Sequence, residues 1–170
     1  MRMKKRLTYL LMLLLLPLLG GCSEEDDVLE IFTGKTWKLN IISLDGQNDW
    51  FDFWNGNSET RKTSMNLRGE NSSVTFTITF NGDEVEGMAE GDFTAQAVNR
   101  SYTGHWSANG NSRELKLTGI QSSGKNDTDV LARAFETGLK NAVRYSGDSQ
   151  YLYIYYEDGQ TTKRMSFQPQ

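Results

Sequence analysis

Hydrophobic and polar residues alternate along several short stretches of this chain, a period typical of β-strands with one buried face. In the first stretch Trp37, Leu39 and Ile41 alternate with Lys38 and Asn40. The same alternation recurs at 74–80, 102–107, 115–117, 151–156 and 165–167. Turn-forming pairs separate these runs, at 81–82, 109–110, 147–148 and 158–159. We therefore expect an α+β fold that is mainly β, a curled antiparallel sheet or partly closed barrel.

One segment has a helical period instead, and it predicts a helix over 127–141. Leu131, Phe135 and Leu139 recur every four residues and would form one apolar stripe. Asp127, Thr128 and Asp129 supply capping oxygens and negative charge at the start, and Lys140 and Arg144 lie at the end, where the helix dipole favours cations. We expect this helix to cover the sheet. The predicted core comprises Trp37, Phe76, Ile78, Leu117, Phe135, Leu139, Leu152 and Phe167.

The segment 46–61 shows neither period and is expected to be a long loop between strands. It carries Trp50 and Trp54 among polar, Asn- and Gly-containing stretches. A second aromatic group, Tyr151, Tyr153 and Tyr155, alternates with aliphatic residues that make the more natural core face. These five aromatic residues form the candidate binding surface, suited to sugar rings or a protein partner. The alternative is that they cover the open ends of a small barrel.

The first 22 residues carry the features of a bacterial lipoprotein signal. A basic start is followed by a leucine-rich run at 7–19, which is too short to span a bilayer as a helix. Leu19, Gly20 and Gly21 precede Cys22, which is the only cysteine. This ending resembles a lipobox, in which the cysteine receives the lipid. The predicted organisation is a signal peptide over 1–21, an acidic tether over 22–29 and one domain over 30–170.

The acidic run behind Cys22 refines the expected location. Residues 23–27 read Ser-Glu-Glu-Asp-Asp, which resembles the motif that sends lipoproteins of Bacteroidota to the outer cell surface. A merely acidic linker is the alternative. We expect an outer-membrane protein that is lipid-anchored at Cys22 and faces the cell exterior.

Charge and cysteine content exclude several function classes. Cleavage before Cys22 removes four of the 18 Lys and Arg residues and none of the 22 acidic residues, so the mature chain has a net charge of −8. Phosphate contacts need a basic patch, so no nucleic-acid partner is expected. A thiol nucleophile and a cysteine-ligated metal are excluded in the mature domain. We expect no metal, no cofactor and no enzymatic activity.

Two features could still support catalysis. Five carboxylates lie within ten residues, at Asp83, Glu84, Glu86, Glu90 and Asp92. Paired carboxylates can hydrolyse glycosides, so a hydrolase that uses this acidic hairpin is one alternative. A solvated hairpin whose charges discourage aggregation is the other interpretation. The single histidine, His105, has no second histidine or cysteine to complete a strong zinc site.

The order of motifs is similar to that of META-domain (HslJ-like) proteins, in a diverged form. The segment 32–39, with its Trp-Lys-Leu, resembles the opening strand of that family, and 120–123 precedes the final helix as it does there. The resemblance covers roughly 30–168. It departs at 85–91, where the glycines remain but the usual Gly-Cys-Asn is lost. The family has no agreed activity, so the resemblance implies a fold and an envelope location. A lipocalin-like protein that binds a glycan or a small ligand is the rival.

Overall fold

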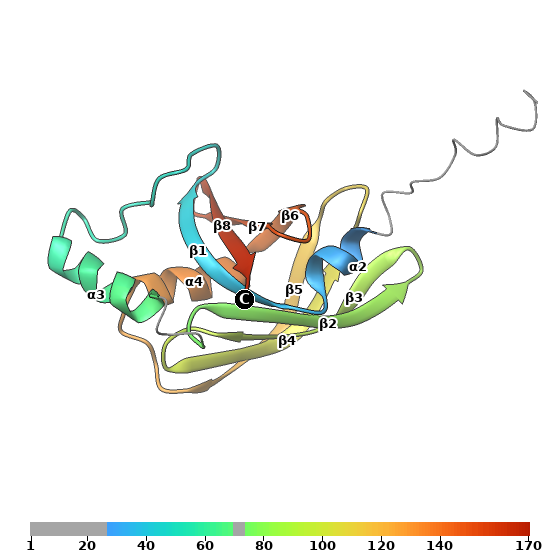
Figure 1. The fold of residues 1–170 in the computed structure, drawn as a ribbon, viewed down its shortest axis with the longest axis horizontal. Helices are drawn as coiled ribbons and strands as arrows, with labels where there is room; N and C mark the ends of the chain where they lie inside the picture. The colour runs from blue at the N-terminus through green and yellow to red at the C-terminus, as the bar shows by residue number, and fades with distance from the viewer. Residues whose placement is uncertain (1–26, 70–73) are drawn as a thin grey trace, which may run out of the picture.

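The computed structural model describes residues 27–69 and 74–170 (Figure 1). The predicted signal peptide and Cys22 lie outside these ranges, so they stay predictions. The elements in chain order are α2 (Asp27–Phe32), β1 (Thr36–Leu44), α3 (Ser58–Arg68), β2 (Thr77–Val85), β3 (Met88–Gln96), β4 (Arg100–Ala108), β5 (Leu115–Gly124), α4 (Val130–Lys140), β6 (Ala142–Gly147), β7 (Leu152–Asp158) and β8 (Thr161–Pro169).

The strands form one antiparallel sheet with the order β5-β4-β3-β2-β1-β8-β7-β6. The sheet curls strongly (Figure 1), and its two edge strands approach each other. An isolated bridge joins Glu114 to Arg144, and the Tyr145 N–H donates to the Arg113 carbonyl at 2.9 Å. The sheet nevertheless does not close into a barrel. The predicted fold class, a curled antiparallel sheet with a covering helix, is confirmed.

The interior is filled by aromatic rings. Phe32 lies 4.8 Å from Trp106 and 4.9 Å from both Phe80 and Tyr145, measured between ring centroids. All eight residues predicted for the core are buried in one cluster. A core packed in this way leaves the sheet stabilised by apolar burial, without disulfides.

Helix α4 covers the sheet as predicted. Asp129 caps it, because its Oδ1 accepts a hydrogen bond from the Ala132 N–H at 3.0 Å. Phe135 is fully buried, and its ring contacts those of Phe76 and Phe167 at centroid distances of 5.8 and 6.3 Å. The apolar stripe read from the sequence is therefore the stripe that faces the core.

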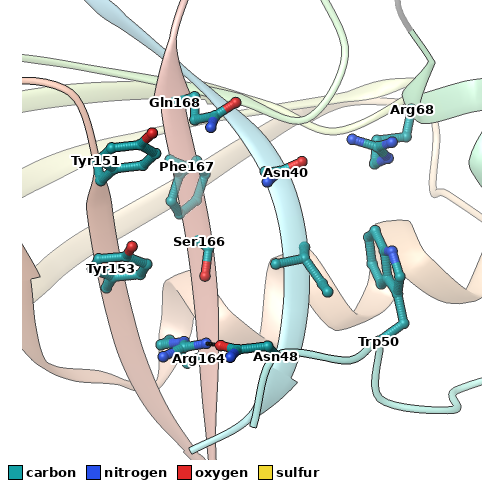
Figure 2. A pocket seen from close by; sticks show the side chains of 11 residues that line it. Asn40, Asn48, Trp50, Arg68, Tyr151, Tyr153, Arg164, Ser166, Phe167 and Gln168 are labelled. Atoms are coloured by element: carbon teal, nitrogen blue, oxygen red, sulfur yellow. Dashed lines mark hydrogen bonds between the residues drawn. The ribbon is translucent and has the colours of Figure 1, made fainter. Parts of the chain in front are cut away.

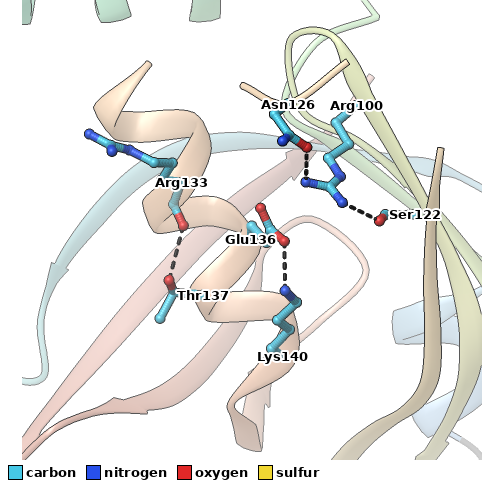
Figure 3. A network of polar contacts seen from close by, with 7 residues as sticks. All are labelled: Arg100, Ser122, Asn126, Arg133, Glu136, Thr137 and Lys140. Atoms are coloured by element: carbon cyan, nitrogen blue, oxygen red, sulfur yellow. Dashed lines mark hydrogen bonds and ion pairs between the residues drawn. The ribbon is translucent and has the colours of Figure 1, made fainter. Parts of the chain in front are cut away.

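Polar contacts tie the start of this helical region to β4 and β5. Asp127 lies before the helix and accepts from the Asn99 N–H at 2.8 Å, so its carboxylate holds a turn. Arg100 donates to Asn126 and to Ser122, both at 2.6 Å (Figure 3). The loop between β5 and α4 is thus fixed by side chains rather than by the sheet ladder.

Two strands depart from the simple alternation. In β1 the register shifts between Leu39 and Ile41, so Ile42 rather than Ile41 turns into the core. Such a bulge adds one residue and reverses the facing of those that follow it. The run predicted at 74–80 also begins late, because Val74 is 69% exposed and β2 starts at Thr77.

The structure changes the predicted bounds of two segments, the tether before the domain and the loop at 46–61. Val28 and Ile31 of α2 are buried, so the prediction of a solvated tether through residue 29 is wrong for its last residues. The expected loop ends early, because Asn57 caps α3 by accepting from the Thr60 N–H at 3.0 Å. Only Ser64 of α3 is buried, so the helix has no apolar stripe that a sequence pattern could reveal.

None of the helices in the described ranges is long and apolar enough to cross a membrane.

Candidate binding site

A pocket of about 330 Å³ lies on the outer face of β1, β8 and β7 (Figure 2). Tyr151, directly before β7, and Tyr153, within it, line one side. Trp50, from the loop after β1, lines the opposite side. The floor between them carries polar side chains, among them Asn40 and Gln168.

The alternation of β8 explains why these polar groups face outward. Met165 and Phe167 turn into the core, so Arg164, Ser166 and Gln168 lie on the other face. Ser166 pairs with Tyr153 of β7 on one side and with Ile41 of β1 on the other. The bulge at Asn40 matters here, because it places both Asn40 and Ile41 at the pocket.

Backbone and side-chain contacts hold Trp50 at the pocket rim. The next residue, Phe51, donates its N–H to the Ile42 carbonyl at 2.9 Å, which fixes the loop to β1. The Trp50 ring packs edge-on against Trp54 at 6.0 Å, and the Arg68 guanidinium lies 5.6 Å from the centre of the Trp50 ring. Two strand spacings, about 10 Å, separate β7 from β1. The pocket therefore has an aromatic group on either side of a polar floor.

Arg164 is the charged group of the floor. Its Nη2 donates to the Gln47 carbonyl at 2.7 Å and to Asn48 Oδ1 at 3.1 Å, and its guanidinium lies 5.2 Å from the centre of the Tyr153 ring. Arg164 Nε and Ser166 Oγ are buried and find no hydrogen-bond partner among the described residues. Each such atom costs about 1–3 kcal/mol unless water or a ligand satisfies it.

A second hollow of about 350 Å³ continues the pocket along β1 and shares Asn40, Arg68 and Gln168 with it. Lys38 lies here and donates its Nζ to the Thr75 carbonyl. Burial and, to a lesser degree, the charge of Arg68 lower the pKa of Lys38 from 10.5 to about 8. No Asp or Glu from the described parts of the chain lines either hollow.

The structure brings together three of the five predicted surface aromatics, namely Trp50, Tyr151 and Tyr153. The prediction is wrong for Trp54, which is 4% exposed and donates its Nε1 to Ser64 Oγ at 2.9 Å. It is also wrong for Tyr155, which is 8% exposed. Helix α3 covers Trp54, and the Arg144 guanidinium, 3.5 Å from the centre of the Tyr155 ring, covers Tyr155.

The polar members of the pocket were not predicted. Arg68 comes from a helix without an apolar stripe, and Asn40 is brought in by a bulge. Arg164 and Gln168 belong to the polar face of a strand that was recognised only from Met165 and Phe167. The alternation of β8 was the one available signal, because it places 164, 166 and 168 on a single face.

The acidic hairpin does not contribute to this pocket. Its five carboxylates are all exposed, and Asp92 lines a separate hollow, where it pairs with His105 at 2.6 Å. Gly82 and Gly91 face each other so closely that a Cβ on either would lie 2.1 Å from a backbone oxygen. These glycines therefore have a structural role. Within the described residues no group of acids and histidines could hold a metal ion. The hydrolase alternative stays a prediction.

Fold and site together define a small curled-sheet domain with an aromatic, polar-floored pocket on its outer face. The chain belongs to the DUF4847 family, described as a domain of unknown function, whose model matches residues 23–169. It is similar to the crystal structure, at 1.00 Å resolution, of a DUF4847 family protein from Bacteroides vulgatus. That match has 23% identity and a TM-score of 0.59, and it covers 83% of this chain and 96% of the other.

At this identity the likeness extends to the fold alone. No curated protein matches the chain. The findings do not address the resemblance to META-domain proteins, which stays a prediction.

Proposed function

We propose that this protein is a lipid-anchored envelope domain that binds a saccharide in the pocket on β1, β8 and β7. The observation that carries the proposal is that Trp50, Tyr151 and Tyr153, from distant parts of the chain, line one pocket. Tyr151 is 42% exposed, although it is a large aromatic residue. Exposed flat rings bury much area at little entropy cost when they stack on a partner.

The polar floor favours a saccharide over an apolar ligand. Asn40, Asn48 and Gln168 present amide groups, which can both donate and accept hydrogen bonds to sugar hydroxyls. An apolar ligand would leave these groups unpaired. The interior of the sheet is occupied by the cluster around Phe32, so the ligand-filled interior of a lipocalin is the weaker alternative.

The proposed location rests on the sequence before the domain. Helix α2 begins at Asp27, so only a few residues separate it from Cys22. We propose that Cys22 carries the lipid and that the domain faces the cell exterior. Cys22→Ser should leave uncleaved precursor, and intact-mass measurement after membrane fractionation checks this. An unmodified Cys22 in the native protein would refute the anchor without affecting the pocket.

The binding proposal is tested with the chain lacking residues 1–22, which retains the whole described core. On a glycan array this protein should bind at least one saccharide class. Trp50→Ala combined with Tyr151→Ala should abolish that binding, because both walls of the pocket lose their rings. Val143→Ala, an exposed apolar residue outside the pocket, is the matched control and should bind normally.

Thermal melts of the same variants separate binding from folding. The double variant should keep a cooperative transition, because neither ring is fully buried. A folded double variant that binds as well as the unsubstituted protein would overturn the proposed site.

A further inference from the structure

Arg164 has no acidic partner among the described residues, unlike the neighbouring Arg144 and Lys163. Elsewhere Arg144 pairs with Asp45 at 2.6 Å, and Lys163 pairs with Asp158 at 2.5 Å. Within the described parts of the chain, no carboxylate lies within 4.0 Å of the Arg164 guanidinium. A charge that is partly buried in a pocket without a counter-ion favours an anion there.

The contacts of Arg164 fix its orientation and leave one nitrogen available. Nη2 is held by Gln47 and Asn48, and the guanidinium packs by the Tyr153 ring. Nη1 has no hydrogen bond with the described residues and is not among the buried atoms. The guanidinium is therefore held in place before a ligand arrives, which reduces the entropy cost of binding.

The charged side chains around Arg164 are positive, as an anion-binding site requires. Arg68 lines the same pocket, and Lys38 lines the hollow that continues it. The mature chain has a net charge of −8, so a pocket lined by cations and by no described acid stands apart from the rest of the surface. Lys38 lines the neighbouring hollow and not the pocket itself, so the inference rests on Arg164.

The floor beside Arg164 contains a further polar group suited to a ligand. Ser166 lies two residues along β8, lines the pocket and is 6% exposed. Its hydroxyl has no hydrogen-bond partner in the described parts of the chain. Ligand or ordered water would satisfy this group.

We infer that the pocket selects acidic saccharides, and that Arg164 binds the carboxylate or sulfate group while Tyr151, Tyr153 and Trp50 contact the sugar rings. The inference rests on the proposed function and specifies its ligand class. The free Nη1 can donate charge-assisted hydrogen bonds to a carboxylate or to a sulfate oxygen, so the inference names an oxyanion in general. Carboxylate and sulfate are distinguished by the choice of probe.

The test compares saccharides that differ only in charge. Oligogalacturonate and its methyl ester share the same sugar backbone, and the ester removes the negative charge. Dextran sulfate and dextran, which carries no charge, provide the second comparison. Isothermal titration of the chain lacking residues 1–22 should show that at least one charged form binds about tenfold or more tightly than its matched form, as expected for a hydrogen bond to a charged group.

Three variants assign the preference to Arg164. Arg164→Gln should reduce the preference to less than about twofold, because the affinity for the charged form should fall much more than the affinity for the neutral form. Arg164→Lys, which keeps the charge but loses the planar fork, should recover part of the preference. Arg133→Gln removes one positive charge from an exposed site on α4 and should leave the preference intact. Circular dichroism melts confirm that each variant is folded.

Each outcome decides between the proposals. Equal affinity for charged and neutral forms overturns the inference and leaves the saccharide proposal standing. Equal weakening of both forms by Arg164→Gln shows that Arg164 only positions the 47–48 loop, and it also overturns the inference. Absence of binding to every saccharide overturns both proposals.

Discussion

The two faces of β7 and β8 carry residues of similar size in opposite roles. On the inner face Leu152, Ile154 and Phe167 are fully buried beneath α4. On the outer face Tyr151, Tyr153 and Arg164 line an open pocket. The same strands therefore provide the stability of the domain on one side and its candidate site on the other.

The comparison shows that aromatic content alone does not distinguish the two roles. Trp50 and Trp54 lie four residues apart in one loop, yet the first lines the pocket and the second is buried against α3. Tyr153 and Tyr155 lie on one strand face, yet Arg144 covers only the second. What covers each ring decides its role, and that cover comes from elsewhere in the chain.

The inner face should tolerate truncation least. Phe135→Ala removes a fully buried ring between Phe76 and Phe167 and should destabilise the domain by about 3–5 kcal/mol. Urea unfolding followed by tryptophan fluorescence measures this loss. A change below about 1 kcal/mol would show that α4 does not seal the core.

The two tryptophans of the loop provide a sharper comparison. Trp54→Ala should cost about 3 kcal/mol, because it leaves a cavity and removes the partner of Ser64. Trp50→Ala should cost about 1 kcal/mol, since the ring is only partly buried. Chemical denaturation of both variants checks the order. Equal losses would mean that Trp50 belongs to the core and not to the pocket.

The tyrosines of β7 test the same difference with a smaller effect. Tyr155→Ala removes a ring that packs beneath Arg144 and should cost about 1–2 kcal/mol. Tyr151→Ala should change stability by less than about 0.5 kcal/mol, because the residue is exposed. Melting temperatures of the two variants measure the contrast. It fails if Tyr151→Ala is the more damaging change.

The smallest expected effect is a pH dependence at Lys38. Burial and Arg68 lower the pKa of Lys38 in the folded protein to about 8, below its ordinary value of 10.5. Between these values the unfolded chain holds a proton that the folded chain has released, so stability rises with pH. Below about pH 8 Lys38 is protonated in both states, and the folded state bears the full free-energy cost of burying this charge near Arg68. Lys38→Gln should therefore be more favourable relative to the unsubstituted protein at pH 7 than at pH 10.

Urea midpoints of both proteins at pH 7 and pH 10 measure this difference. The substitution also removes hydrogen bonds of Lys38, but their contribution to stability cancels when the stability difference at pH 7 is compared with that at pH 10. A relative stability of Lys38→Gln that rises toward pH 10 would contradict the lowered pKa.

The sequence predicted the core and the covering helix because those signals are local. The period-two runs around Ile78 and Leu152, and the stripe through Phe135, each record which side of one element is apolar. The sequence of helix α3 shows no apolar stripe, because only Ser64 on it is buried. The bulge at Asn40 was equally hidden, since it shows only in the pairing of β1 with β8.

The chain by itself determined the β-rich class, the residues of the core and the aromatic nature of the candidate site, because burial and alternation follow from neighbours in sequence. Only the tertiary structure decided that Trp50 lines one pocket with Tyr151 and Tyr153, that Trp54 and Tyr155 are covered, and that Arg164 lies in this pocket with no acidic partner among the described residues. These facts depend on contacts between segments about a hundred residues apart in the chain. Such contacts are set by strand pairing and by what packs over each face, and no local pattern records them.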